Sequence, residues 1–438
     1  MKNKIFILLL SLQTIISCGQ TKENKIKDIV ITNVSVIPIK SNEVLKNQDV
    51  VVKEGKIVSI EKHNKKKYKD LQIIDGTGKY IMPSLSDAHV HFPNTEEEME
   101  HMLQLNIING VTKLRSMRGE LKHIDWRTKY NTNTSFYPKL YLSPPPVSRN
   151  LELTTLQIED FVKTAKEKGF DFVKILSIKS QPIFVQLDSI CKKYKMPIGG
   201  HFPKLASGNE LTDAIVFNSN YTSFEHLGGL AGETRETLEK RIALLKEKNI
   251  VICPTLSWYS TGSGRYSLEE SRKLPGMEFI SKTTVEEWIE GTQKYREKMG
   301  DAAYKEEVAN ELKSLDEKYL IVKKLNDAGI QMILSPDASS KYMIPGFSVL
   351  GEMELLKNAS LSNYDILKMA TINFATFFKE VNGTIEAGKT ADFILLNNNP
   401  LEDLNTLKKI EGLYFNNQYL DAKALEAMRL KLLPTSQN

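Results

Sequence analysis

Cysteine and tryptophan are scarce in this chain, with three of each among 438 residues. So few cysteines exclude a disulfide framework as the main source of stability, and a chain of this length can bury a large core instead. Cys191 and Cys253 lie in apolar stretches, which favours two buried thiols over a bridge. The fold is therefore expected to be held by packing.

An excess of one charge is also lacking. The net charge is +5, and charged and hydrophobic residues make up 26% and 41% of the chain, which is ordinary for a globular protein. The run Lys65-Lys66-Lys67 is typical of a solvated loop rather than a binding patch. We therefore expect no nucleic-acid partner, because such partners need a strong basic surface.

The N-terminus has the pattern of an export signal. Lys2 and Lys4 precede an apolar run from Ile5 to Ile16 that is too short to cross a bilayer. The sequence around Cys18 resembles a bacterial lipobox, which implies a signal peptide over 1–17 and a lipidated Cys18 followed by a polar tether, 18–27. The resemblance predicts an exported lipoprotein of the cell envelope, anchored in the membrane by more than one acyl chain. An ordinary signal peptide with an incidental cysteine is the alternative.

The remaining chain divides into three parts. Short runs rich in β-branched residues fill 28–80, and strand and turn signals of the same character return in 377–438. The two ends are predicted to pair into one small β-sandwich domain. Between them, 81–376 alternates strand and helix patterns, with helices expected at 155–168, 181–194 and 234–248.

Eight candidate strands fall in the middle part: 81–86, 111–116, 138–143, 171–176, 197–200, 222–225, 250–254 and 331–335. Eight parallel strands alternating with helices predict an α/β fold of the (β/α)8 TIM-barrel type. An insertion, 255–330, holds an aromatic and glycine-rich loop (256–275) and then a charged helical stretch (284–326). We interpret it as a lid or pocket wall; a surface hairpin is the alternative.

Chemistry-bearing residues stand at the ends of these strands. His89 and His91 form a His-X-His pair, and because strand side chains alternate, both imidazoles point to the same side and suit zinc. Asp87 is expected to orient one of these rings. Further along the chain come Lys174, His201, His226 and Asp337. Barrel chemistry is found at the carboxyl ends of the strands, so these side chains are expected to converge.

These motifs resemble the amidohydrolase superfamily, and in particular its two-metal branch with a bridging lysine and prolidase-like members. The resemblance covers almost the whole chain after the N-terminal signal. It includes the split sandwich, Asp87-X-His89-X-His91, Gly110-Val111-Thr112, the Lys174 strand, His201-Phe-Pro, Glu225-His226, Asp337, Thr371-Ile-Asn-Phe-Ala375 and the segment from Gly383 to Asp392.

The resemblance implies a metal-dependent hydrolase that cleaves an amide or peptide-like bond of a small molecule or short peptide. Two divalent metals, most often zinc, would be held by His89, His91 and Asp337 and by His201 and His226. Lys174, carboxylated by carbon dioxide, would bridge them, since a bare ammonium has no lone pair for a metal. A hydroxide shared by the metals would attack, and Asp337 would carry its proton to the leaving nitrogen.

Substrate contacts are indicated only weakly. Arg115 or Arg118 could grip a carboxylate, although an ion pair within the protein is equally compatible, and Tyr259, Arg265 and Tyr266 have similar standing. His63 and His101 are expected on the surface or in packing, and His123 follows a strand whose loop could reach the pocket.

Two other readings of the site stay open. One is a one-metal relative, an imidazolonepropionase-like hydrolase of cyclic amides or a deaminase, in which Lys174 would be a structural or ion-pairing lysine. The other is a binding lipoprotein on an amidohydrolase scaffold without activity. Asp337 could likewise cap a helix, given the residues around it.

Overall fold

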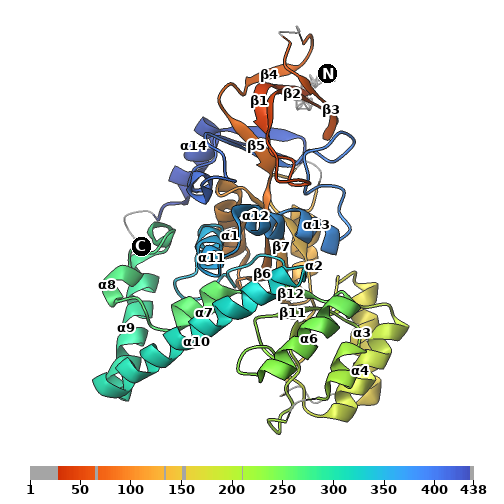
Figure 1. Cartoon of the computed structure of the whole chain (residues 1–438), viewed down its shortest axis with the longest axis vertical. Coiled ribbons are helices and arrows are strands. Elements are labelled where there is room, and N and C mark those ends of the chain that lie inside the picture. The colour runs from red at the N-terminus through yellow and green to blue at the C-terminus, as the bar shows by residue number, and fades with distance from the viewer. Residues whose placement is uncertain (1–27, 65–67, 133–134, 150–153, 210, 435–438) are drawn as a thin grey trace, which may run out of the picture.

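The structure, a computed structural model, describes residues 28–64, 68–132, 135–149, 154–209 and 211–434. The expected signal peptide, Cys18, the tether and the Lys65–Lys67 run lie outside these residues. Figure 1 shows strands from both chain ends gathered at one pole, alternating strands and helices in the middle, and a helical arm on one side of the other pole. Within the described residues, no helix is long and apolar enough to span a membrane.

The two chain ends join in one sheet of eight strands. Its order is β15-β14-β13-β5-β1-β2-β3, and β4 also pairs with β1. The strands are β1 (Ile29–Val36), β2 (Leu45–Lys53), β3 (Lys56–Lys62), β4 (Gln72–Asp75), β5 (Tyr80–Pro83), β13 (Phe393–Leu396), β14 (Gly412–Phe415) and β15 (Gln418–Asp421).

The junction between the chain ends lies at β5. This strand pairs in parallel with β1 and antiparallel with β13, where Ile81 faces Leu395. The predicted pairing of the two ends is therefore confirmed. The sheet topology shows one sheet, whereas a sandwich has two separate sheets. β5 forms hydrogen bonds on both of its edges and so joins the strands of the two chain ends.

The middle of the chain builds two parallel sheets. One has the order β6-β7-β8 and the other β12-β11-β10-β9. Their strands are β6 (Leu85–His91), β7 (Val111–Arg118), β8 (Lys139–Tyr141), β9 (Val173–Ile175), β10 (Ile198–His201), β11 (Tyr221–Glu225) and β12 (Val251–Cys253). Six of the eight predicted strands are thus present, and the predicted strand 81–86 is divided between β5 of the chain-end sheet and β6. The predicted alternation with helices gives a mixed α/β fold.

The eighth predicted strand, 331–335, is wrong as a regular strand. Its residues make single bridges and hydrogen bonds instead: Met332 bridges to Ile252, and the carbonyl of Leu334 accepts from the Ala88 N–H. Pro336 follows at once, and since proline has no N–H to donate, a regular ladder cannot continue there. The regular sheets of the described residues therefore do not form one continuous eight-stranded ring.

Helices pack around these sheets. Their bounds are α1 (Glu96–Ile108), α2 (His123–Tyr130), α3 (Thr155–Glu167), α4 (Gln181–Lys193), α5 (Asp213–Phe217), α6 (Arg235–Lys248), α11 (Phe347–Asn358), α12 (Asn363–Ala370), α13 (Ile372–Phe377), η2 (Leu404–Lys408) and α14 (Ala422–Leu432). The three helices predicted from apolar periodicity, now α3, α4 and α6, are confirmed within one or two residues. Cys191 and Cys253 are free and buried, also as predicted.

The insertion is helical throughout most of its length. It contains α7 (Leu256–Gly262), α8 (Leu268–Ser271), η1 (Met277–Phe279), α9 (Lys282–Met299) and α10 (Asp301–Asp327), and α8 to α10 form the arm in Figure 1. The expectation of an irregular loop over 256–275 is wrong. A capping box explains part of the difference, because Ser267 accepts from the Glu270 N–H while Glu270 accepts from the Ser267 N–H.

Glu352 of α11 ties the insertion to the middle of the fold. Its two carboxylate oxygens accept hydrogen bonds from the backbone N–H groups of Leu256 and Ser257, at 2.8 and 2.6 Å. The side chain is fully buried, and this desolvation raises its pKa to about 7 although the two N–H donors oppose the shift. The orientation of α7 therefore depends on a buried acid.

We predict that Glu352→Gln changes the pH dependence of stability. A folded pKa above the unfolded value means that wild type loses stability as the pH rises from about 4.5 to about 7. The neutral variant does not show this loss. Over the same pH interval, its free energy of unfolding therefore rises relative to that of wild type by about 1.4 kcal/mol per unit of pKa shift. Urea unfolding at pH 5 and pH 8 measures the gain. Glu354→Gln, exposed on the same helix, is the control, and an equal difference at both pH values would contradict the prediction.

Candidate metal centre

Four imidazoles converge where β6, β10 and β11 end. The ring centroids of His89 and His91 lie 5.4 Å apart, and those of His89 and His226 lie 5.1 Å apart. His201 joins the group through His226, at 4.8 Å. His89 is buried and the other three rings are partly buried, so the cluster opens toward one side. Four of the residues singled out in the sequence are thus brought together.

Asp337 completes this cluster. Its Oδ1 lies 3.4 Å from Nε2 of His89 and 3.5 Å from Nε2 of His91, and its Oδ2 lies 3.9 Å from Nε2 of His226. Oδ1 is buried without a hydrogen-bond partner. Two imidazole nitrogens and an unpartnered carboxylate oxygen around one space are a donor set that fits a divalent metal.

Lys174 lies in the middle of β9, paired in register with Gly199 of β10. It is 2% exposed, and burial lowers its pKa to about 8 although the charges of Glu225 and Asp337 oppose this. In turn, its charge helps to lower the pKa of each of the four clustered histidines. The lysine therefore belongs to the same electrostatic unit as the imidazoles.

Burial keeps the imidazoles neutral. Desolvation lowers the pKa of His91 to about 4 and that of His201 to about 3, and it lowers the pKa of His89 and His226 well below the usual range. The same desolvation raises the pKa of Asp337 to about 7, against the charge of Lys174. Neutral imidazole is the form that binds metals, so the histidines are ready ligands at neutral pH.

Glu225 is a site residue that the sequence reasoning left without a role. Its Oε2 lies 3.0 Å from Nδ1 of His89, and its Oε1 accepts from Arg115 at 2.8 Å and from the Ser223 hydroxyl at 3.0 Å. Because Nδ1 of His89 is engaged in this way, Nε2 is left to face Asp337. The available signal was a glutamate at the end of a predicted strand, directly before a candidate metal-binding histidine.

The prediction for Asp87 is corrected by this arrangement. Asp87 accepts hydrogen bonds from the Ser335 hydroxyl and from the backbone N–H of His89, and the imidazole is oriented by Glu225 instead. Ser335 also donates to the carbonyl of His89 at 2.9 Å. Asp87 thus holds the backbone between β6 and Asp337 rather than a ring.

Left-handed backbone at three positions turns side chains toward the cluster. His226, Thr255 and Asp337 have φ angles of 64°, 50° and 71°. On a regular strand, Glu225 and His226 would point to opposite faces, but this backbone lets both serve the same site. Thr255 then meets Nδ1 of His226 at 2.6 Å, which leaves Nε2 of that ring facing the cluster.

Arg115 is not positioned as a substrate contact. It is fully buried, its guanidinium bonds Glu225 and Ser223, and it lies over the ring of Phe172 at 4.4 Å. The ion-pair alternative is therefore the correct one. Arg115 lies on β7, which pairs in parallel with β6, the strand that carries His89 and His91.

The other weak candidates lie around the opening. Arg118 is exposed and pairs in register with His91, and its charge contributes to the lowered pKa of that ring. The hydroxyl of Tyr259 accepts from the Leu227 N–H at 3.1 Å, and its ring lies 6.3 Å from that of His226. The role of these two residues as substrate contacts remains a prediction.

Arg265 and Tyr266 belong to the insertion. Arg265 is exposed, donates to the Ser260 hydroxyl at 3.2 Å and lies 5.4 Å from the ring of Tyr266. As substrate contacts, they too remain predictions. Both line cavities formed by the insertion.

The remaining histidines have structural partners. His123 is buried and stacks on Trp126 at 5.0 Å, so it does not reach the centre. His63 meets Asp49 at 2.8 Å, and Nε2 of His101 lies 3.2 Å from the carbonyl of Leu432. The packing or surface roles predicted for His63 and His101 are consistent with these contacts.

A family model described as the amidohydrolase family matches residues 80–418, which include every residue of the cluster. The chain belongs to the amidohydrolase family. It is accordingly a hydrolase that acts on carbon–nitrogen bonds, as the motifs at the strand ends predict. A comparison with curated proteins finds no match.

Solved structures support the fold of this amidohydrolase. It is similar to the bottromycin amidohydrolase AH, with 18% identity and a TM-score of 0.74 over 92% of this chain and 90% of that one. It is also similar to an Xaa-Pro dipeptidase (17%, TM-score 0.66, 90% and 100% covered) and to a putative prolidase from Bifidobacterium longum (18%, TM-score 0.67, 93% and 99% covered). The likeness extends over nearly the whole of each chain.

We predict that Glu225→Gln weakens metal binding about 10- to 100-fold, because the ring of His89 loses its charged anchor. Arg115 also loses its counter-charge, so the variant should unfold at a lower temperature. Zinc affinity measured by competition with a chelator, beside a thermal unfolding curve, checks both effects.

The matched control for this prediction is Glu239→Gln, which removes a surface pair with Arg235 far from the cluster. It should leave zinc affinity unchanged. Equal zinc affinity in wild type and Glu225→Gln would show that Glu225 does not position His89.

Proposed function

We propose that this amidohydrolase cleaves an amide or peptide-like bond of a small molecule or short peptide with the help of two divalent metals. The observation that carries the proposal is Oδ1 of Asp337, which is buried without a partner beside Nε2 of His89 and His91. A buried carboxylate oxygen without a donor is costly unless a cation completes it. Neutral imidazoles around it favour zinc.

The ligands divide between two metals. His89, His91 and Asp337 would hold one, and His201 and His226 the other. Lys174 would bridge them after carboxylation, in which its neutral amine attacks the carbon of carbon dioxide and loses a proton to give an anionic N-carboxylate. A pKa lowered to about 8 supports this step, since more of the amine is neutral than in an ordinary lysine.

When bound, the metals would polarise the scissile carbonyl and lower the pKa of the attacking water toward neutrality. Asp337 would accept the proton of that water and deliver it to the leaving nitrogen. Its raised pKa, about 7, suits a group that must both take and release a proton near neutral pH. Glu225 and Thr255 would hold the rings of His89 and His226 in place throughout.

A one-metal hydrolase of cyclic amides or a deaminase is the second candidate. One observation favours it: His89, His91 and Asp337 form a compact ligand group by themselves, without His201 or Lys174. We prefer two metals because a buried lysine among four imidazoles has no evident structural purpose. A binding protein without activity is disfavoured because all six positions expected to bind the metals carry suitable side chains.

We also propose that the two parallel sheets work as one barrel, with 81–376 as its domain and the chain-end sheet as a second domain. Isolated parallel bridges support closure at three edges: Val147 with Ile175, Ile252 with Met332, and Val90 with Ala338. A closed ring would bring the ends of β6, β9, β10 and β11 to one mouth.

We predict opposite effects of two substitutions on metal content and turnover. Lys174→Ala removes the bridge, so zinc per chain should fall from two to one or none. Asp337→Asn should keep most of the zinc and lose at least about 100-fold in turnover, since the proton carrier is gone. Zinc is measured by elemental analysis of protein prepared with zinc and bicarbonate. One zinc in wild type and in Lys174→Ala would establish the one-metal candidate instead.

Export and lipid anchoring are proposed from the N-terminal sequence alone. We predict that the full chain, produced in a bacterium, partitions into the detergent phase and that Cys18→Ser moves it to the aqueous phase, because the acylated cysteine is lost. Phase partitioning followed by mass measurement of the N-terminal peptide checks this. If wild type is exported with an unmodified Cys18, the lipid anchor is contradicted and the segment is an ordinary signal peptide.

A further inference from the structure

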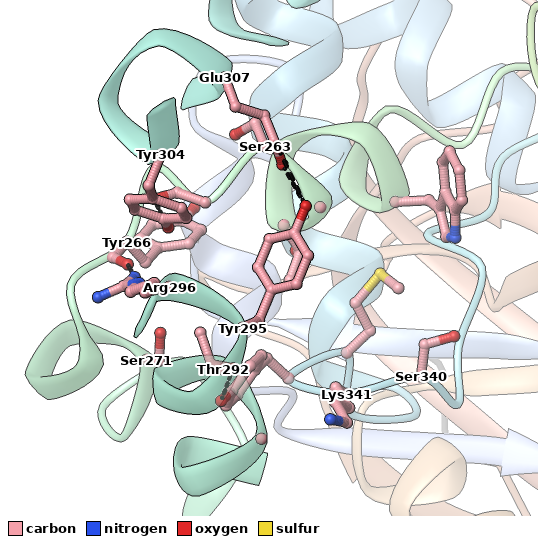
Figure 2. A pocket seen from close by; sticks show the side chains of 17 residues that line it. Ser263, Tyr266, Ser271, Thr292, Tyr295, Arg296, Tyr304, Glu307, Ser340 and Lys341 are labelled. Carbon is pink, nitrogen blue, oxygen red and sulfur yellow. Dashed lines mark hydrogen bonds between the residues drawn. The ribbon is translucent and has the colours of Figure 1, made fainter. Parts of the chain in front are cut away.

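The insertion forms most of the lining of an open cavity of about 550 Å³. Residues of α7, α9, α10 and the segment 340–343 line it, as Figure 2 shows from close by. The lining is rich in aromatic side chains: Trp258, Tyr266, Tyr295, Tyr304 and Tyr342. This size is ordinary for a site that binds a small molecule, for which roughly 300–1,000 Å³ is typical.

The cavity shares a wall with the metal centre. The ring of Trp258 lies 5.4 Å from that of His226, and the hydroxyl of Ser340 lies 3.4 Å from the carbonyl oxygen of Asp337. Trp258 and Ser340 both line the cavity. A substrate held at the centre therefore has the cavity beside its scissile bond.

Several hydroxyls of the wall have hydrogen-bond partners. The hydroxyl of Tyr295 points to the carboxylate of Glu307 (Figure 2), with a donor–acceptor distance of 2.9 Å. The hydroxyl of Tyr342 lies 3.0 Å from that of Thr292. The hydroxyl of Tyr304 donates to the carbonyl of Gly264 at 3.3 Å. Because these hydroxyls are engaged, the three tyrosines offer mainly their ring faces to a ligand, and Lys341 adds a cationic side chain to the lining.

Arg296 contributes to the same wall. Its Nη2 donates to the carbonyl of Tyr266 at 3.0 Å, and its guanidinium lies 4.8 Å from the ring of Tyr304. The cation therefore supports the rings rather than standing free in the cavity. Met343 is buried and adds a thioether, which also packs well against aromatic groups.

We propose that this cavity binds an aromatic ring of the substrate, on one side of the scissile amide, and so selects amides that carry an aromatic group. Ring faces prefer aromatic partners over aliphatic ones, since offset or edge-to-face contacts add to simple burial. The assignment of the cavity to substrate rests on the proposed function. The binding of an aromatic ring does not require catalysis and is tested separately.

The test uses Tyr295→Ala, which removes an exposed ring of the cavity without touching the metal centre. Tyr295→Phe keeps the ring and removes only the bond to Glu307. The matched control is Tyr194→Ala at the C-cap of α4, because the hydroxyl of Tyr194 likewise donates to a glutamate, Glu159, at 2.9 Å. Three probes are compared: N-acetylphenylalanine, phenylacetylalanine and N-acetylalanine.

Binding is measured first, by calorimetry on Asp337→Asn protein loaded with zinc, so that no probe is consumed. One of the two ring-bearing probes should bind about 10- to 100-fold more tightly than N-acetylalanine. Adding Tyr295→Ala should remove at least about tenfold of that preference, whereas Tyr295→Phe and Tyr194→Ala should retain it. Equal binding of all three probes, or a preference that Tyr295→Ala leaves intact, would overturn the proposal.

Hydrolysis by the wild-type metal-loaded enzyme separates this proposal from the proposed function. The preferred ring-bearing probe should have the higher kcat/KM, and Tyr295→Ala should raise its KM with little change in kcat or in the hydrolysis of N-acetylalanine. Selective binding of a ring-bearing probe, without hydrolysis of any probe or of a wider dipeptide panel, would contradict the amide-cleaving function. It would still support the cavity as a binding site for an aromatic ring. Hydrolysis of all three probes at equal rates would support amide cleavage and contradict the aromatic-ring site.

Discussion

The buried chain of contacts from Arg115 through Glu225 to His89 is the constraint on which the centre depends. It fixes one imidazole at Nδ1 and leaves Nε2 for the space beside Asp337. Charge balance explains why it can be buried at all: the guanidinium offsets the carboxylate, and the carboxylate holds a neutral ring.

The centre gathers titratable side chains that are buried together, away from water. Burial lowers the pKa of the histidines and of Lys174 and raises that of Asp337, so each group moves toward its neutral form. Neutral imidazole and a neutral amine are the forms that a metal site and a carboxylation step need. The same desolvation that costs stability therefore keeps the imidazoles in the form that can bind a metal.

The insertion adds an aromatic cavity beside the centre. Glu352 holds the start of α7, and α7 carries Trp258 and Tyr259 to the edge of the cluster. The long helices α9 and α10 then close an aromatic cavity against the segment that follows Asp337. A change in the packing of α7 would reach both the histidine cluster and the cavity.

The sequence by itself determined which residues could form the centre, because side-chain chemistry limits the ligands and parallel strands end at one edge. It also indicated the pairing of the chain ends and the helices with clear periodicity. Tertiary structure alone decided that Glu225 rather than Asp87 orients His89, that Arg115 is an internal partner, and that the insertion forms an aromatic wall. Those outcomes depend on which side chains are buried together and on the left-handed backbone at His226, and neither follows from local pattern.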